Sequence, residues 1–533
     1  MAGVMPPAPE GAPPEGAAPP ASSGSVWDEW PPSTSRLLTE YSTREDHPWR
    51  LAGRRALLTG SARSGVGEIR LHPWRIVREA RLEVDGRVPD AVSLRVAPDE
   101  IVRVLQAGEV QLTERVSVAL DQGLVFWSVV ADAPVAIGLT WFTDFQRSPP
   151  PEIPATPLVP LAPLEDSGAG GRVRVGLEDP PVRFQAEIQA GSILPPEPVT
   201  DFFGGGFRFE VRGTRLLRLI LAAGGDEAEL ERALDALHRR KLRAFRQDRI
   251  LHARRIEERL VGLESPEPAL DRAFEWAKVQ LDGLLVEISG RGRNLTGEAP
   301  AAAVRATLAM GDRDIAKDVI RHLGRAEPDE DVMRRLLELV ECYARWSGDL
   351  TMLRRLWPGL EAPYRSTRVS PTLARGLDAV ARALGMEVPA PEPTEAGGGA
   401  SASVAWTDAM AWRRAAGGDD PASLVLGVIE GLWGVRPDAL RGEVRVEPAL
   451  PEDWSEMGLR RLRVGPTTLD LRVRRRPERT VVMVRRGAGP AIRLRLRLPG
   501  RAGGGPVTVD QVELGADEVA FMIEDVHEVV YHD

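Results

Sequence analysis

The pattern of hydrophobic and polar positions changes twice along this 533-residue chain and divides it into three structured parts. From about residue 50 to 222, short runs alternate apolar and polar residues, as in EIRLHPWRIVREARLEVDG and FRFEVRGTRLLRLILAAG. Period-two alternation with β-branched residues and Gly-containing punctuation predicts antiparallel strands, here in a large β-sandwich. The Pro-rich stretch 148–163 is expected to be a surface loop, because proline interrupts strand pairing.

The spacing becomes helical at about residue 225. Apolar positions among many charges over 225–262 predict one connector helix with Asp226 as its N-cap. From about 266 to 434 the pattern predicts helical hairpins, the first helix having Ser265 as its N-cap. The turns of two hairpins are expected at the Gly-Asp of LAMGDRD and at Ser347, Gly348 and Asp349. The buried stripe of the first helix is predicted to be Leu270, Phe274, Ala277, Leu281 and Leu284.

Alternation returns at about residue 441 and predicts a small terminal β-sandwich whose arginine-rich strands carry arginine on the solvated face. Residues 389–402 are expected to be a flexible linker, and the Pro- and Ala-rich N-terminus to be disordered. The predicted fold class is multi-domain α and β. Its parts are a disordered tail at 1–48, an N-terminal antiparallel β-sandwich at 49–224, a connector helix at 225–262, a hairpin domain at 263–436 and a C-terminal β-sandwich at 437–533.

Composition and local motifs exclude several function classes. A net charge of −9 argues against a nucleic-acid binder, which needs a surplus of Lys and Arg. No run of about 20 apolar residues predicts a membrane span. One cysteine, Cys342, and an N-terminus unlike a secretory signal favour a cytoplasmic location. The histidines lack metal-ligand spacing, so no metal or cofactor is expected. GGGF at 204–207 lacks the context of a phosphate loop and is expected to be a turn.

Several strings resemble the six-hairpin glycosidase superfamily, in its glycogen-debranching (amylo-α-1,6-glucosidase-like) branch. ALDRAFEWAKVQLDGLL is similar to the first barrel helix, and LAMGDRDIAKDVIRHLG to the next hairpin. The second hairpin contains a motif similar to the family's Arg-Trp-Thr-Gly-Asp … Leu-Trp-Pro. It consists of Arg345, Trp346, Ser347, Gly348 and Asp349, followed by Leu356, Trp357 and Pro358. GLWGVRPDALRGEVRVEPALPEDWSEMGLRRLRVG is similar to the exit into the C-terminal sandwich. The resemblance covers about 55–500 and implies an N-terminal β super-sandwich, an (α/α) hairpin toroid and a small C-terminal β-sandwich.

The resemblance also implies that the catalytic toroid is incomplete. Residues 266–434 leave room for about half of the hairpins, at ~1.5 Å per helical residue. Glu298 and Ala299 stand where the family has a substrate-binding Arg and Asp. The segment that carries the family's general acid normally follows the Leu-Trp-Pro helix, but here the chain passes from APYRSTRVS directly to SPTLARGLDAV. The family's His-Gln-…-Trp pattern is replaced by VAWTDAMAW.

Glycoside hydrolysis needs two carboxyl groups that flank the scissile bond. The candidates here are Glu298 and Asp408, with Trp346, Trp406 and Trp412 as sugar-stacking residues. The ordinary structural interpretation, which we favour, makes Glu298 a first-turn helix carboxylate and Asp408 a solvated helix residue.

Three functions stay open at this stage. The favoured one is a catalytically degenerate, sugar-binding or scaffolding protein of α-glucan (glycogen) metabolism with an oligo- or polysaccharide partner. The second is an active glycoside hydrolase that uses two carboxylates. The third is a structural interaction protein, for which a homo-oligomer is expected because open hairpins expose apolar faces.

Overall fold

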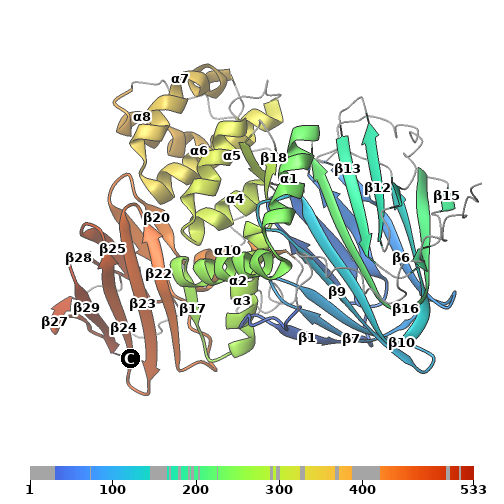
Figure 1. Cartoon of the computed structure of the whole chain (residues 1–533). Helices are drawn as coiled ribbons and strands as arrows, with labels where there is room; N and C mark the ends of the chain where they lie inside the picture. Colours follow the sequence, from blue (N-terminus) through green and yellow to red (C-terminus); the bar gives the residue numbers. More distant parts are fainter. Residues whose placement is uncertain are drawn as a thin grey trace, which may run out of the picture.

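The computed structural model defines the fold over most of the chain and describes several separate ranges. These are 30–72, 74–143, 165–166, 170–177, 182–189, 192–193, 197–201, 204–224, 226–288, 292–295, 300–323, 330–366, 371–386, 420–499, 505–514 and 518–532. Sheets at either end of the chain flank a group of helices (Figure 1). The predicted linker 389–402 and the Pro-rich loop predicted at 148–163 lie outside these ranges.

The N-terminal strands form a large antiparallel sheet faced by a smaller one, as the period-two pattern predicts. Apolar side chains from both sheets share one core, so alternate residues of each strand point inward. The large sheet contains β1 Thr39–Ser42, β6 Glu79–Val84, β7 Asp90–Val96, β8 Ile101–Ala107, β9 Val110–Val118, β10 Leu124–Thr143, β11 Glu165–Asp166, β12 Gly170–Leu177, β13 Val182–Gln189, β14 Ser192–Ile193, β15 Glu197–Asp201 and β16 Gly204–Gly224. The small sheet contains β2 Pro48–Ala52, β3 Ala56–Ser61, β4 Gly65–Leu71 and β5 Trp74–Val77.

The turn expected at GGGF is wrong, because residues 204–207 begin the long strand β16. This strand pairs with β10 from Gly205 opposite Thr143 to Ala222 opposite Leu124. A Cβ at Gly206 would lie 1.9 Å from the carbonyl oxygen of Trp141. The glycines therefore permit close pairing of two backbones rather than a reversal of the chain.

Strand β1 falls inside the range 1–48 that the sequence analysis assigns to a disordered tail. Polar contacts hold this segment to the turn between β7 and β8. The Trp30 indole Nε1 donates to Glu100 Oε2 at 2.7 Å, and the Ser33 backbone N–H donates to Glu100 Oε1 at 2.8 Å. The composition of residues 1–48 could not predict these contacts, because their acceptor, Glu100, lies about 70 residues away in the sequence.

The predicted connector helix is two helices, α1 Glu227–Arg239 and α2 Leu242–Arg259. Asp226 is the N-cap of α1 as predicted, and its Oδ1 accepts from the Glu229 backbone N–H at 2.8 Å. The chain becomes extended at Arg240 and Lys241 before α2 begins. Apolar residues of α1 and the start of α2 pack on β10 and β16, with the Phe126 and Phe245 ring centroids 5.4 Å apart.

The next helices follow the predicted hairpin pattern, including turns at Gly311 and at Gly348, both at positive φ. The first of them begins at Pro268, so the predicted N-cap at Ser265 is wrong; Glu267 occupies that position, and the Ser265 hydroxyl donates to Asp271. Its predicted apolar stripe does pack into the core. The helices are α3 Pro268–Asp282, α4 Pro300–Ala309, α5 Arg313–Leu323, α6 Glu330–Ser347, α7 Leu350–Ser366, α8 Pro371–Ala383 and α10 Pro421–Leu426, which continues into the π-helix η1 Gly427–Leu432; β18 Leu285–Ile288 and β19 Gly292–Leu295 form a small hairpin.

Two sheets follow at the C-terminal end, and arginine alternates with buried residues along their strands as predicted. An edge strand of the larger sheet is β17 Gly262–Glu264, the segment directly after α2, so this sheet also includes residues from the middle of the chain. The larger sheet contains β17, β22 Glu456–Val464, β23 Thr467–Arg476, β24 Arg479–Ala488, β26 Val507–Val509, β27 Val512–Leu514 and β29 Val526–His532. The smaller contains β20 Arg436–Asp438, β21 Glu443–Val446, β25 Ile492–Arg497 and β28 Glu518–Ile523.

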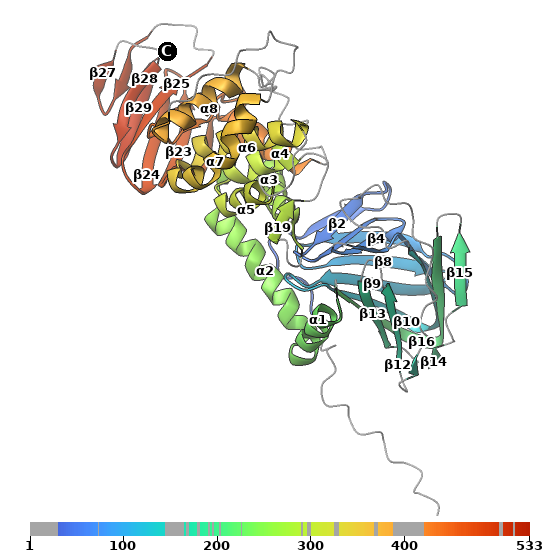
Figure 2. The ribbon, with the colours of Figure 1, turned by 90° about the horizontal axis from the view of Figure 1, so that it is seen from above.

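The helices and the C-terminal sheets share one continuous hydrophobic core, while the N-terminal sheets have their own. Figure 2 shows α2 as a long rod along the junction between these two bodies. Buried arginines make the polar part of this junction. Arg249 donates to the carbonyl oxygens of Ala52 at 2.7 Å and Pro98 at 2.8 Å. Arg246 donates to Asp99 Oδ2 at 2.7 Å.

The far end of α2 is joined to the C-terminal sheet by Arg461. This residue has a positive φ of 58° at a β-bulge of β22. Its guanidinium donates to the carbonyl oxygens of Glu257 at 2.8 Å and Leu260 at 2.9 Å. These are carbonyls of the last turn of α2, which lack helical partners and carry the negative end of the helix dipole.

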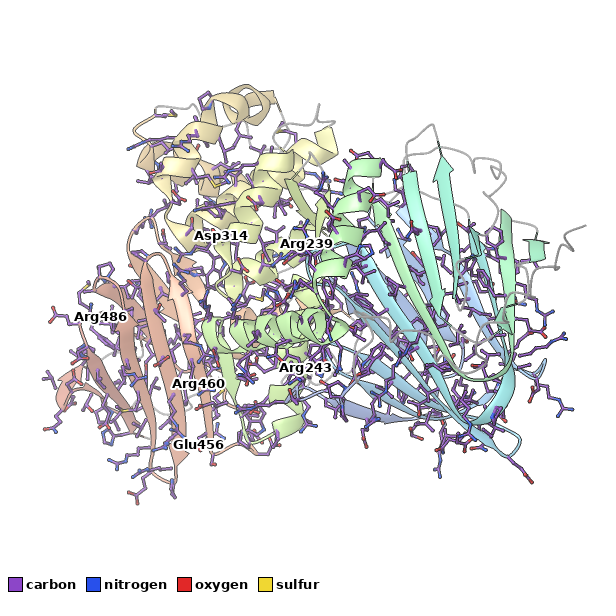
Figure 3. The ribbon with its side chains drawn as sticks, in the orientation of Figure 1. Arg239, Arg243, Asp314, Glu456, Arg460 and Arg486 are labelled. Atoms are coloured by element: carbon purple, nitrogen blue, oxygen red, sulfur yellow. The ribbon has the colours of Figure 1, made fainter. Side chains whose placement is uncertain are left out.

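We expect Arg246→Ala to lower the free energy of unfolding by about 3–5 kcal/mol, because it removes the buried positive charge that pairs with the carboxylates of Asp99 and Glu100. Urea denaturation followed by tryptophan fluorescence measures the change. Arg243→Ala is the matched control, since Arg243 is exposed on the same helix and is labelled in Figure 3. Its loss should stay within about 0.5 kcal/mol. Equal effects of the two substitutions would contradict the role given to Arg246.

Candidate functional site

Four of the five site residues predicted from the sequence lie outside the described residues. They are Glu298, Trp406, Asp408 and Trp412. Their assignment as catalytic carboxylates and sugar-stacking rings stays a prediction.

The fifth residue, Trp346, lies near the end of α6 and is 2% exposed. Its ring belongs to the core shared by the helices and the C-terminal sheets. Its backbone carbonyl accepts from the Gly465 N–H at 2.9 Å, which ties α6 to a turn of the C-terminal sandwich. In this conformation the ring face is covered by protein, so a role in stacking on sugar also stays a prediction.

The described helices bring a different set of charged residues together. Arg305 on α4 reaches Glu430 on η1, with Arg305 Nη2 2.7 Å from Glu430 Oε2. The two side chains are 35% and 19% exposed, so the pair lies at the boundary between core and solvent. Glu430 stands on a π-helical turn, a rare geometry that occurs often at functional sites.

A second carboxylate, Glu341 on α6, lies in the same region. Its Oε1 is 3.3 Å from Arg345 Nη1, one turn along the helix. The opposite helix α8 carries Gly376 here, and a Cβ at that position would lie 2.5 Å from Glu341 Oε1. Glycine inside a helix costs about 0.5–1 kcal/mol relative to alanine. Gly376 therefore lowers the helix propensity of α8, but it leaves the space that the Glu341 carboxylate occupies.

The electrostatic environment links these groups. Burial raises the pKa of Glu341, and the nearby Arg345 and Arg305 only partly offset that rise. Burial alone would lower the pKa of Arg305, but Glu430, Cys342 and Glu341 together outweigh burial, and the pKa is raised. Cys342 follows Glu341, and burial raises the pKa of its thiol to about 12. The thiol is therefore neutral at physiological pH and a poor nucleophile.

We call Arg305, Glu341, Arg345 and Glu430 the helical charge cluster. Carboxylate oxygens accept, and guanidinium groups donate, the hydrogen bonds that sugar hydroxyls make. A carboxyl group with a raised pKa is also what general acid catalysis requires. The cluster therefore offers both binding chemistry and the outline of an acid–base pair. Both of its carboxylates, however, already face an arginine.

Sequence reasoning missed this cluster because its members look like ordinary helix residues. Glu341 lies in LLELVECYARW, where the helical stripe is apolar and glutamate is expected on the solvated side. Glu430 interrupts the apolar run VLGVIEGLWGV. The carboxylate of Glu430 within this apolar run was the sequence feature that could have indicated the cluster, because a charge at a half-buried position requires a partner.

Two searches of the described residues gave negative results. No group of three or more His, Cys, Asp and Glu side chains among them is arranged to hold a metal ion. None of the helices in the described ranges is long and apolar enough to cross a membrane.

Comparison with known proteins finds no matching family model and no matching curated protein. Among solved structures, a putative kojibiose phosphorylase from human microbiome has a TM-score of 0.47 at 8% identity, with 92% of each chain covered. A bacterial glucoamylase complexed with acarbose has a TM-score of 0.38 at 11% identity and covers 67% of this chain and 66% of its own. The GH92 family glycosyl hydrolase ccman5 has a TM-score of 0.39 at 10% identity and covers 64% and 59%. These neighbours are carbohydrate-active proteins by name. All three TM-scores lie below 0.5.

We expect Glu341→Gln to stabilise the protein at pH 8. The folded state raises the pKa of Glu341 above its ordinary value of 4.5, so holding the charged form disfavours folding at pH values above the raised pKa. The gain should disappear below pH 4.5, where the carboxyl is protonated in both states. The free energy of unfolding at pH 8 and pH 4 measures this difference.

Glu338→Gln is the matched control, because Glu338 is exposed on the same helix. It should show no such pH-dependent gain. A Glu341→Gln protein that is less stable than the parent at pH 8 would contradict the environment described for this carboxylate.

Proposed function

We propose that the protein is a cytoplasmic, glycoside-hydrolase-like protein of carbohydrate metabolism that binds α-glucan oligosaccharides of the glycogen type without cleaving them. In this proposal the hairpin helices are an incomplete (α/α) toroid of the glycogen-debranching kind. The helical charge cluster, together with Glu298, Trp406, Asp408 and Trp412, forms the sugar-binding surface.

The observation that carries the proposal is the connection between α7 and α8. Helix α7, which contains the Leu-Trp-Pro string, ends at Ser366, and α8 begins at Pro371. Only residues 367–370 separate the two helices. In the resembling glycosidases the segment with the general acid follows the Leu-Trp-Pro helix, and four residues cannot supply it. Hydrolysis with general acid assistance requires that group.

The ion pairs of the helical charge cluster support binding in preference to catalysis. Glu430 and Glu341 each face an arginine, at 2.7 Å and 3.3 Å. A carboxylate paired in this way can still accept a hydrogen bond from a hydroxyl group, because each oxygen has two acceptor sites. Charge-assisted hydrogen bonds of this kind are stronger than neutral ones, so the cluster suits a polyhydroxylated ligand.

A second candidate function is an active hydrolase, and the raised pKa of Glu341 favours it. In that case Glu341 donates the proton to the leaving oxygen, and Glu430 acts on the opposite face as base or nucleophile.

Calorimetry and product analysis with the full chain separate the two functions. We expect maltohexaose to bind and to be recovered intact after prolonged incubation, and glycogen to release no shorter sugars. The Glu341→Gln/Glu430→Gln double variant should bind at least about tenfold more weakly, which corresponds to about 1.4 kcal/mol. Glu338→Gln serves as the matched control, because Glu338 is exposed on α6, and it should bind like the parent.

Release of glucose or maltose that disappears in the double variant would establish the hydrolase instead. Hydrolysis that survives in the double variant but is lost in Glu298→Gln/Asp408→Asn would assign it to the carboxylates predicted from the sequence. Absence of any binding to maltohexaose or glycogen would contradict the proposed function.

A further inference from the structure

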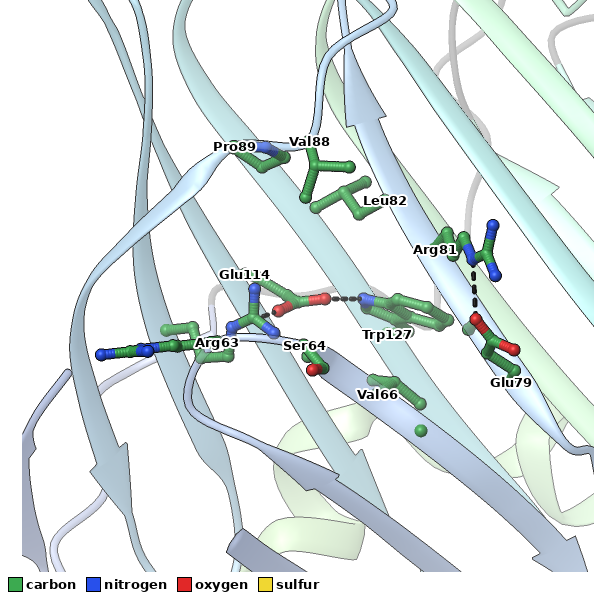
Figure 4. A pocket seen from close by; sticks show the side chains of 14 residues that line it. Arg63, Ser64, Val66, Glu79, Arg81, Leu82, Val88, Pro89, Glu114 and Trp127 are labelled. Carbon is green, nitrogen blue, oxygen red and sulfur yellow. Dashed lines mark hydrogen bonds and ion pairs between the residues drawn. The ribbon is translucent and has the colours of Figure 1, made fainter. Parts of the chain in front are cut away.

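A pocket of about 250 Å³ lies in the N-terminal sheets, far along the chain from the helical charge cluster (Figure 4). It opens where the small sheet, through Arg63 to Gly67, faces β6, β8, β9 and β10 of the large sheet. Its volume is somewhat below that of ordinary ligand sites, whose range begins at about 300 Å³. A ligand of monosaccharide size is the upper limit of what it can enclose.

The floor of the pocket is polar and buried. Arg103 and Glu114 are each 4% exposed, and Arg103 Nε lies 3.1 Å from Glu114 Oε2. The indole Nε1 of the buried Trp127 donates to the other carboxylate oxygen, Oε1, at 2.9 Å. Figure 4 shows the hydrogen bond between Trp127 and Glu114.

The floor of the pocket contains an unsatisfied hydrogen-bond donor, the guanidinium of Arg103. Nη1 of Arg103 is buried and has no hydrogen-bond partner, and the contact of its Nε with Glu114 lacks hydrogen-bond geometry. Unsatisfied groups of this kind are rare in protein interiors because each costs free energy. A ligand hydroxyl in the pocket would satisfy the guanidinium and could donate to the adjacent carboxylate.

Gly65 fixes the position of the guanidinium. Its φ is +80°, and a Cβ there would lie 2.1 Å from Arg103 Nη1. Both the backbone conformation and the close contact therefore require glycine. The turn between β3 and β4 is thus shaped around the Arg103 side chain.

The rim combines two ion pairs and one further arginine, Arg63, with apolar surface. Glu79 Oε1 pairs with Arg81 Nε at 2.7 Å, so this pair and the Arg103–Glu114 pair leave no net charge. Arg63 directs its guanidinium to the backbone carbonyl oxygens of Thr43 and Arg44. Val88 is 69% exposed beside the buried Leu82 and Pro89. Paired charges favour hydroxyl groups over a free anion, and the apolar side chains suit the C–H face of a pyranose.

We propose that this pocket binds a neutral monosaccharide, with vicinal hydroxyls on Arg103 and Glu114 and one ring face against Val88 and Leu82. The site is separate from the helical charge cluster and does not depend on the function proposed for it. It gives the N-terminal sheets a recognition role of their own.

The test is a titration of D-glucose and D-gluconate into the full chain carrying Glu341→Gln/Glu430→Gln, followed by ligand-observed NMR and calorimetry. This background removes the contribution of the helical charge cluster. We expect glucose to bind more tightly than gluconate. Val88→Trp, which fills the mouth from an exposed position, should weaken glucose binding at least tenfold.

Val92→Trp is the matched control, because Val92 is 51% exposed on β7 but does not line the pocket. It should bind glucose like its parent. Three results would each overturn the proposal: no glucose binding, tighter binding of gluconate, or equal losses for the two tryptophan variants. Loss of maltohexaose binding by the charge-cluster variants has no bearing on this outcome, so the two proposals fail separately.

Discussion

The position of the N-terminal sheets against α2 depends on buried arginines of this helix. They donate hydrogen bonds to backbone carbonyls of the N-terminal part of the chain. Burial lowers the pKa of Arg249 to about 10, so its guanidinium still carries a charge at neutral pH. That charge is compensated by the carbonyl oxygens of Ala52 and Pro98 and by the nearby carboxylates of Asp99 and Asp282. A buried charged group restricts the position of α2, because a displacement of the helix would separate the Arg249 guanidinium from its partners. The orientation of the N-terminal sheets is therefore set by hydrogen bonds of fixed direction as well as by apolar contact.

The same helix determines where the candidate sites lie. At its C-terminal end α2 is bound by Arg461, and the chain continues as β17 at the edge of the C-terminal sheet. The hairpin helices then pack into a core shared with that sheet, which fixes α4, α6 and η1 relative to one another. The helical charge cluster thus rests on helices held by a large core. The pocket around Arg103 belongs to the other body, whose core is separate.

Sequence patterns predicted the elements that depend on local periodicity. The alternation of β23 and β25, the stripe of α3 and the Asp226 N-cap all follow from residues within a few positions of each other. The incorrect predictions concern segments whose structure is determined by residues far away in the sequence. Gly204 to Phe207 form a strand because β10 pairs with them, and residues 30–42 are held by Glu100 and β7. The break between α1 and α2 had no signal in the helical spacing, which continues through it.

The candidate sites were harder to predict for the same reason. Arg305 meets Glu430 across 125 positions of sequence, and Gly376 makes room for Glu341 from another helix. Conversely, the residues that family resemblance selected lie outside the described structure, except for the buried Trp346. Resemblance therefore predicts a type of protein, whereas the geometry identifies charged groups that lie together on the helices.

In the proposed function, the hairpin helices bind an α-glucan without cleaving it. Hydrogen–deuterium exchange of the full chain is measured with and without maltohexaose, and the sugar is recovered and sized afterwards. We expect slower exchange in α4, α6 and η1 on addition of the sugar, and maltohexaose of unchanged length. Unchanged exchange in these three elements, or shortened sugar, would contradict it.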